Sequence, residues 1–389
     1  MPSSIRKALN ELPVTLDETY GRILKGIPNQ KSHHARRLLQ CMVTAIRPLR
    51  VEELAEIFAI EFDTNDALNL VEGWRPEHPE EALISACSTL IAIIDDEGSK
   101  IVQFSHFSVK EFLTSDRLQT SDVGNICQFY VCLNPAHTIL VRACLTVLLQ
   151  MDEKMDNHRL ATYPLAFYAA RHWSDHAKFG EVGSQFQDSI ERLFNPKEPY
   201  FRAWIWIRDD EDAKSTTTDA TEDPRPLRPP SPTSTPLWHA VDCGFNGLVE
   251  HLIITQGVNA KHGFEAPLHL ASIRGMFDIA RLLLDHGADV NIRDGTDWTP
   301  LHFASIKGDI EVAQLLLERG AILNAQSISG YFPLQLASVD VHFEAVRLLL
   351  DHGADMSIKA EGLTPYQFAT RHGHHDVAQL LLEHGAARE

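Results

Sequence analysis

The chain has 389 residues, of which 44% are apolar and 23% charged, and this composition excludes a wholly disordered or collagen-like protein. Carboxylates outnumber Lys plus Arg by 53 to 35, so the net charge is 35 − 53 = −18, which disfavours general binding to nucleic acid. Six cysteines and no secretory leader predict a reducing, cytoplasmic location, and the longest apolar run, Ala82 to Ile94, is too short to span a membrane.

Residues 1–120 carry the pattern of three helices followed by a two-stranded hairpin and another helix. Apolar residues recur first at helical spacing and then in two short β-rich runs around the turn signal Asp96–Ser99. The expected helices, strands and last helix are, in order, Leu16–Leu24, Ala35–Ile46, Val51–Ile60, Leu90–Ile94, Ile101–Phe104 and Ser108–Leu113. This order predicts a winged-helix domain in a mainly α protein.

A winged helix can bind DNA, so DNA binding is an alternative function for this half of the chain. The expected helix Val51–Ile60 has three glutamates and no Lys or Arg, whereas a helix that faces phosphates needs positive charge. Residues 1–207 have a net charge of 21 − 27 = −6. The sequence therefore favours a winged helix that does not bind nucleic acid.

Residues 121–207 are predicted to form a helical connecting domain. Cys127, Cys132 and His137 follow one another at intervals of five residues, which splays the side chains on a helix, so buried free thiols are favoured over a zinc site. Other apolar helical runs contain three cysteines that we expect in the core, Cys41, Cys87 and Cys144. Three tryptophans are expected to pack between helices: Trp173, Trp204 and Trp206. For Trp204 and Trp206 the alternative is that they dock the repeats described below.

Four segments of this half form motifs, Leu12–Tyr20, Arg47–Ala55, Phe104–Leu113 and Tyr163–Trp173. They resemble fungal NACHT–ankyrin proteins, which are NLR-like receptors of the signal-transducing NTPase type. The resemblance implies a winged helix grouped with one named after GPI inositol deacylase, located directly after a NACHT domain, and a helical segment that joins it to ankyrin repeats. The resemblance also places His106 at a histidine that approaches nucleotide in the full receptor.

The NTPase part of that family is not matched. The sequence has no Gly-x-x-x-x-Gly-Lys-Ser/Thr motif, so no backbone loop is expected to hold a triphosphate and nucleotide hydrolysis does not carry over. We therefore expect His106 to pack under the wing. The sequence is expected to be a truncated relative, one that has lost its N-terminal domain, or an incomplete gene model.

Residues 208–234 differ in composition from both flanks. An acidic run, a Ser/Thr run and five prolines give the segment no apolar periodicity, which predicts a disordered linker. An alternative is that a proline-directed kinase phosphorylates Ser231-Pro232 and Thr235-Pro236. Such pairs are common in linkers, so a plain linker is favoured.

The remaining residues repeat. Five prolines stand 31, 33, 33 and 32 residues apart, each followed four residues later by alanine: Pro236, Pro267, Pro300, Pro333 and Pro365. Units two to five continue to a Leu-Leu-Leu triplet and a Gly-Ala pair, so each unit has proline in the first turn of one helix and glycine at the end of the next. A unit of about 33 residues headed by Thr-Pro-Leu-His-x-Ala resembles the ankyrin repeat, which predicts five ankyrin repeats over residues 235–389.

Some units depart from the pattern. Trp238 stands at the usual histidine position in repeat one. Repeat four has Phe332, Gln335 and Val341 in place of threonine, histidine and glycine, so we expect local strain there. The regular histidines, His269 and His302, are expected to brace turns. We expect no metal site at these histidines, nor at those of the helix ends and the last repeat, which are His286, His352, His384, His372, His374 and His375.

The repeats predict a non-enzymatic scaffold or adaptor that binds another protein on the concave surface of stacked helices and loop tips. No Gly-x-Ser-x-Gly or His-Glu-x-x-His motif occurs, and no cofactor is expected. Positions that match the family's variable contact sites are occupied by Arg274, Trp298, Lys307, Tyr331, Asp340, Arg371 and His372. Trp298 and Tyr331 occupy equivalent positions and should be neighbours, unless Trp298 only covers the next turn.

An alternative follows from the resemblance. The chain would be a regulatory and sensor fragment of a NACHT-type receptor, which works by association with a separate NACHT-bearing chain. Both hypotheses expect a protein partner, no nucleic acid and no membrane.

Overall fold

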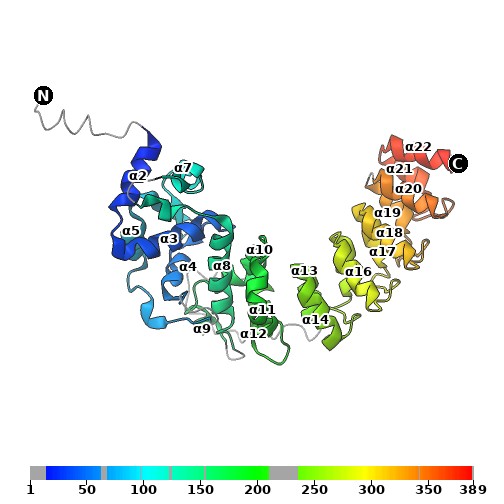
Figure 1. The fold of residues 1–389 in the computed structure, drawn as a ribbon. Coiled ribbons are helices and arrows are strands. Elements are labelled where there is room, and N and C mark those ends of the chain that lie inside the picture. The colour runs from blue at the N-terminus through cyan, green and yellow to red at the C-terminus, as the bar shows by residue number, and fades with distance from the viewer. Residues whose placement is uncertain are drawn as a thin grey trace, which may run out of the picture. The chain divides into compact units, whose positions relative to one another are not determined.

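The computed structural model describes residues 15–62, 68–96, 98–121, 125–152, 155–209, 235–340 and 342–387, and the chain divides into two compact units, residues 1–229 and 230–389 (Figure 1). The predicted mainly α fold is confirmed. Nearly all of the predicted linker 208–234 lies outside the described residues, as does Val341. No helix in the described ranges is both long and apolar enough to cross a membrane.

The first unit begins with a small domain of short helices around a three-stranded sheet. Its elements are α2 (Leu16–Gly26), α3 (Asn29–Thr44), β1 (Leu49–Arg50), α4 (Val51–Ala55), η1 (Glu56–Ala59), η2 (Glu72–Trp74), α5 (Pro79–Cys87), η3 (Ser88–Leu90), β2 (Ile91–Asp96), β3 (Ser99–Phe104), α6 (Phe107–Leu113) and α7 (Asp116–Gln119). The strand order is β1-β3-β2, all antiparallel, and Val102 of β3 is opposite Leu49 on one side and Ile93 on the other.

Two details of this domain differ from the prediction. The expected helix Val51–Ile60 is not continuous, because α4 ends at Ala55 and the chain goes on as the 3-10 helix η1. The last α-helix before the hairpin is α5, which the sequence did not predict, and its first turn contains Glu80 and Glu81. The hairpin itself was predicted, but β1 was not.

Two of the three glutamates of Val51–Ile60 bind arginines, whereas Glu52 is exposed. Glu53 is buried and accepts two hydrogen bonds from Arg47, at 2.6 and 2.8 Å, while Glu56 is buried and accepts two from Arg75, at 2.6 and 3.0 Å. Burial raises the pKa of Glu56 although Arg75 acts in the opposite direction. These ion pairs connect α4 and η1 to the neighbouring loops that contain the arginines.

The rest of the first unit is helical. It contains η4 (Ile126–Phe129), α8 (Leu133–Leu148), α9 (Asn157–Leu160), α10 (Ala166–Ala177), η5 (Val182–Phe186), α11 (Gln187–Leu193) and α12 (Tyr200–Asp209). Trp173 and Trp204 lie in a buried aromatic cluster with Phe194 and Phe201, and the Trp204 indole donates to the carbonyl of Ala170 at 2.8 Å. Trp204 is therefore part of the core of its own unit rather than an exposed docking residue.

A chain of hydrogen bonds joins α8 and α10 to the segment after α3. The Ile46 backbone N–H donates to the Tyr168 hydroxyl at 3.1 Å, and that hydroxyl lies 2.7 Å from His176 Nε2. His176 Nδ1 lies 2.8 Å from His137 Nδ1. Burial, with His137 and His172 nearby, lowers the pKa of His176 to about 3, so the imidazole is neutral and can both accept and donate.

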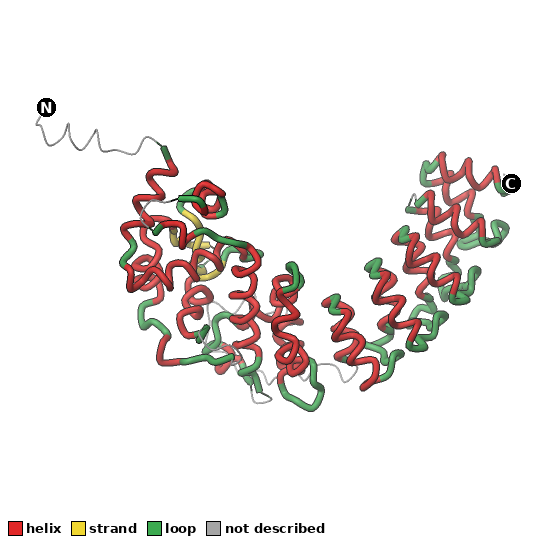
Figure 2. Tube along the Cα trace, viewed as in Figure 1, coloured by secondary structure: helices red, strands yellow, loops and turns green. Residues whose placement is uncertain are grey.

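The second unit consists of helix pairs that pack in two parallel rows. The first helices are α13 (Pro236–Cys243), α15 (Pro267–Ile273), α17 (Pro300–Lys307), α19 (Pro333–Val339) and α21 (Pro365–Arg371). The second helices are α14 (Asn246–Gln256), α16 (Phe277–Asp285), α18 (Ile310–Glu318), α20 (Phe343–Asp351) and α22 (His375–Glu383). Each first helix contacts the next first helix and each second helix the next second helix, while the longer loops between pairs follow one edge of the unit (Figure 2).

Candidate protein-binding surface of the repeats

Buried side chains hold the loops of neighbouring repeats together. The Nδ1 atom of His302 accepts from the backbone N–H of Thr299 at 3.0 Å, and its Nε2 lies 3.3 Å from the Tyr331 carbonyl in the next repeat. His269 makes the same pair of contacts, with Ala266 N–H and the carbonyl of Ile292. Burial lowers the pKa of His302 to about 4, so the ring is neutral and keeps one acceptor and one donor. The prediction that these histidines brace turns is confirmed.

The expected strain at this position in repeat four is absent. Gln335 replaces histidine, and its Oε1 accepts from the backbone N–H of Phe332 at 3.1 Å while its Nε2 donates to the Ile358 carbonyl at 2.9 Å. The amide therefore reproduces both hydrogen bonds of the imidazole. Repeat four differs in residue type but keeps the connection to its neighbour.

The remaining regular histidines end the second helices. Their Nδ1 atoms lie 2.8 to 2.9 Å from the carbonyl four residues earlier, in the residues His286, His352 and His384. His374 has a different role, because its Nε2 lies 2.6 Å from the carbonyl of Val339 in the preceding repeat. These contacts give the recurring histidines a structural role in their repeats.

Charged residues line the ends of the first helices. Arg274, Lys307, Asp340 and His372 occupy the same position in four successive repeats, and all four are exposed. Arg371 lies one residue earlier in its repeat and is also exposed. The Arg274 guanidinium pairs with the carboxylate of Asp242, which lies in the last turn of the first helix of the preceding repeat. Five of the predicted contact residues therefore share one edge of the first-helix row.

A partly exposed apolar row adjoins these charges. Ile273, Ile306 and Val339 occupy the position just before Arg274, Lys307 and Asp340 in their repeats, and each is half-buried. Asp242 and Arg371 stand at the same position in the first and last repeats. These five positions therefore form an apolar strip with an acidic end at Asp242 and a basic end at Arg371.

Trp298 and Tyr331 lie in successive loops and are connected through His302. The Trp298 ring stacks on the His302 ring, with centroids 5.7 Å apart, and the same histidine reaches the Tyr331 carbonyl. The Tyr331 hydroxyl donates to Glu361 of the next loop at 2.6 Å. Both aromatic side chains are half-buried, and Trp298 packs on His302 and Phe303 of its own repeat and keeps an accessible face.

The sequence analysis missed two residues of this loop edge. Phe264 is 76% exposed and packs over Gly295 in the next loop, and Ile328 is 70% exposed. The Ile328 backbone N–H donates to the Thr296 carbonyl at 3.0 Å, which holds that loop against its neighbour. A large apolar residue a few residues before the helix-opening proline, Phe264 before Pro267 and Ile328 before Pro333, was the available signal.

Two further predictions about the first unit are wrong. Cys127 and Cys132 are exposed, because Cys127 lies in a 3-10 turn and Cys132 directly precedes α8, so they do not share one buried helix. His106 does not pack under the wing: it is exposed and caps α6, and its Nδ1 lies 2.6 Å from the Ser108 hydroxyl. The expected core position of the other three cysteines of this unit is confirmed, since Cys41, Cys87 and Cys144 are buried.

Comparison with known proteins bears on both units. The family model described as ankyrin repeats (3 copies) matches residues 237–327 and 322–388. The chain contains ankyrin repeats. The model of the GPI inositol-deacylase winged helix domain matches residues 21–123, so the chain also contains a winged helix of that type. Ankyrin repeats are non-catalytic and support a role in protein interaction.

One curated relative matches much of this chain. The azaphilone pigments biosynthesis cluster protein L of Monascus ruber is 30% identical over 299 residues, which cover 72% of this chain. The match covers 61% of the relative, so the chain spans about three fifths of its length. The wider resemblance to NACHT–ankyrin proteins stays a prediction.

Proposed function

We propose that this chain is a non-enzymatic scaffold or adaptor whose ankyrin repeats bind a partner protein on their concave surface. The observation that carries the proposal is the row of accessible apolar side chains along the loop edge, namely Phe264, Trp298, Ile328 and Tyr331. Exposed apolar groups beside charged ones are typical of protein-binding sites, and aromatic residues supply much of their binding energy.

The charged column at the C-terminal ends of the first helices supports specificity rather than affinity. Arg274, Lys307 and Arg371 give it positive charge, with Asp340 between the last two in chain order. A partner with an apolar ridge and flanking carboxylates matches this arrangement, although the whole chain is acidic. The proposal places the chain in the cytoplasm, where its six free cysteines stay reduced.

The test compares variants of the loop edge in binding to a partner captured by proximity labelling and then purified. Replacing both Trp298 and Tyr331 by alanine is expected to weaken binding about tenfold or more. The pair Phe264→Ser and Ile328→Ser should act similarly while leaving the stacking on His302 intact. Ile254→Ser is the matched control, because Ile254 is 77% exposed but belongs to a second helix.

Circular dichroism must show that each variant remains folded. Unchanged affinity in both double variants would remove the loop edge from the binding site. Equal weakening by Ile254→Ser would place the partner on another face of the repeats.

A second candidate function is a regulatory and sensor part that acts together with a NACHT-bearing chain. The match of residues 21–123 to a winged helix of the GPI inositol-deacylase type favours it. Sequencing transcripts across the 5′ end of the gene tests this alternative. An in-frame Gly-x-x-x-x-Gly-Lys-Ser/Thr upstream would support it, whereas transcription that starts at Met1 would leave the adaptor function.

A further inference from the structure

An apolar row follows the turns between the two helices of successive repeats. It consists of Phe277, Ile310 and Phe343, each the first residue of its second helix. Phe277 is half-buried, while Ile310 and Phe343 are 38% and 36% exposed. Because neighbouring second helices pack against each other, these side chains form one row, which we name the turn row. It lies at the opposite end of the first helices from the loop edge.

A carboxylate directly follows each residue of the turn row. In repeats two and four this carboxylate is balanced within its own helix, because Asp278 forms an ion pair with Arg281 at 2.9 Å and Glu344 forms one with Arg347. Both arginines are on the exposed face of the second helices. The carboxylates therefore lie on the second-helix side of the turn row.

Repeat three lacks this balance. Gln314 stands at the position of the two arginines, and its amide donates to Glu318 at 3.0 Å. Glu311 is exposed, and its carboxylate has no ion pair among the described residues. Lys307 ends the first helix on the other side of the turn row and is also exposed, again without an ion pair in the described ranges. An unpaired anion and an unpaired cation therefore flank Ile310.

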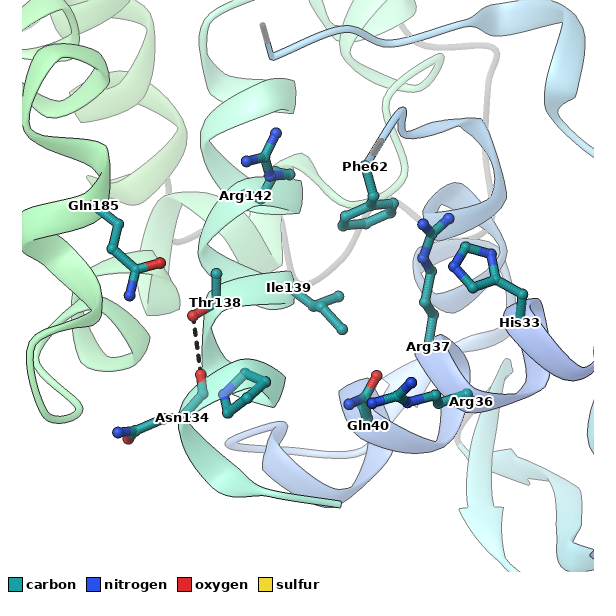
Figure 3. A pocket seen from close by; sticks show the side chains of 11 residues that line it. His33, Arg36, Arg37, Gln40, Phe62, Asn134, Thr138, Ile139, Arg142 and Gln185 are labelled. Carbon is teal, nitrogen blue, oxygen red and sulfur yellow. Dashed lines mark hydrogen bonds between the residues drawn. The ribbon is translucent and has the colours of Figure 1, made fainter. Parts of the chain in front are cut away.

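The cations of the first unit are arranged differently. A cleft of about 470 Å³ lies between α3 and α8, with side chains from both helices on its two sides (Figure 3). The Arg37 guanidinium there lies 4.4 Å from the centroid of the Phe62 ring. That of Arg142 lies 5.7 Å from the Phe186 centroid. These arginines have contacts within the chain, whereas the two charges of repeat three are exposed.

A two-fold axis along the turn row makes this surface complementary to itself. Such an axis exchanges the two sides of the row, so that Ile310 of one copy meets Ile310 of the other. Lys307 of each copy then meets Glu311 of the other, which gives two identical ion pairs. The phenylalanines of repeats two and four extend the apolar contact on either side of this centre.

The same axis is compatible with the charges of the outer repeats. In repeat four it brings Asp340 opposite Glu344 of the other copy, but Arg347 already balances that glutamate. In repeat two it brings Arg274 opposite Asp278, and each of these has a partner within its own chain. The unpaired charges of repeat three therefore determine how the two copies align.

We propose that the chain forms a homodimer through the turn row, with the two-fold axis passing through repeat three. Ile310 and the two phenylalanines supply the apolar contact, and the reciprocal pairs of Lys307 and Glu311 fix the register. A contact over three repeats is small for a stable interface, so we expect a reversible dimer of micromolar affinity. The loop edge stays accessible in both copies, so the dimer presents two partner-binding surfaces.

Sedimentation equilibrium of the full chain at about 1–100 µM protein and about 150 mM salt tests the proposal. A reversible equilibrium between monomer and dimer is expected. Lys307→Glu and Glu311→Lys should each weaken association about tenfold or more, because each variant places like charges at both ion pairs. The two single variants mixed together should associate as tightly as the wild type, since opposite charges then meet again at both contacts.

Ile310→Ser should weaken association about tenfold through the loss of apolar contact. Two exposed residues outside the turn row provide the matched controls, Ile322→Ser and Lys359→Glu. Ile322 is 50% exposed in the loop after the second helix of the same repeat, and Lys359 lies in a later loop. Circular dichroism must show that every variant melts at the wild-type temperature.

Three outcomes would overturn the proposal: a chain that stays monomeric throughout, controls that weaken association as much as the turn-row variants, or single charge variants that do not associate with each other. Restored association in the mixture supports it, because mixing does not reverse a loss of stability. The measurement contains no partner protein, so a monomeric chain would leave the proposed function of the loop edge unaffected.

Discussion

The uncharged ring of His302 connects two neighbouring loops, and this role determines how the stability of the repeats depends on pH. Its two ring nitrogens have opposite hydrogen-bonding functions, and the ring can fulfil both only while it is uncharged. An unfolded chain protonates its histidines near their ordinary pKa of 6.5, whereas burial holds that of His302 at about 4. Between these values the unfolded state binds more protons, so stability is lost as pH falls from about 6.5 towards 4.

The substitution His302→Gln should leave stability at pH 7 within about 1 kcal/mol and reduce the loss in acid, because a glutamine makes the equivalent contacts at Gln335. A single fully linked proton changes the free energy of unfolding by about 1.4 kcal/mol for each pH unit. Urea unfolding of the repeats at pH 7 and pH 5 measures the difference.

His302→Ala is the control for this prediction. It removes both contacts and leaves the Thr299 N–H and the Tyr331 carbonyl without the bracket, so it should cost about 1–3 kcal/mol at pH 7. An equally steep acid dependence in His302→Gln would show that His302 is not the group that titrates.

At the scale of the helix pair, Gly308 must remain glycine for two reasons. Its φ angle is +67°, and a Cβ atom there would collide with the imidazole of His342 from the next repeat. That imidazole cannot easily move away, because its Nε2 lies 3.0 Å from the Ile306 carbonyl. Gly308→Ala should therefore destabilise the repeats by both backbone strain and steric overlap.

Gly287→Ala provides the comparison that separates these causes. Gly287 has a φ of +84°, but no heavy atom lies within 4 Å of the position that a Cβ would take. Its substitution should cost about 1–2 kcal/mol from strain alone. Gly308→Ala should cost about 1–3 kcal/mol more in urea unfolding, and equal losses in the two variants would contradict a role for the His342 contact.

Local sequence was sufficient to predict the helices of the second unit, because each repeat carries the same signals for its helix ends. The proline, alanine and glycine positions of the second unit predicted the helix pairs, because each unit contains both of its own helix ends. In the first unit the decisive partners are distant in sequence. Glu56 binds Arg75 nineteen residues later, and the chain tightens into η1 where the spacing of Val51–Ile60 predicted more α-helix.

The missed helix α5 and the missed loop residues have different causes. The apolar run Ala82–Ile94 crosses from a partly buried helix into a partly buried strand, and such a run does not distinguish the two by periodicity. The exposure of Phe264 depends on the neighbouring repeat, whose Gly295 leaves room for its ring. Cys127 and Cys132 were misplaced because the turn before α8 is not visible in their spacing.

At the scale of the whole molecule, the two units obtain their stability in different ways. The first unit has one buried cluster, in which Trp173 and Trp204 pack with phenylalanines, and a buried hydrogen-bond chain through His176. The second unit has no such centre in its described residues, because each helix pair packs on its neighbours and the stability adds along the row.

This difference predicts two separate unfolding transitions in calorimetry of the full chain. Fluorescence of the buried tryptophans Trp173 and Trp204 should report mainly on the first unit, although Trp238 and Trp298 also contribute. Gly308→Ala should lower the transition of the repeats by several degrees and leave the other unchanged, because changes that share no contacts act independently. A single transition that moves as a whole in Gly308→Ala would show that the two units unfold as one, and the adaptor would then have to be treated as one cooperative body.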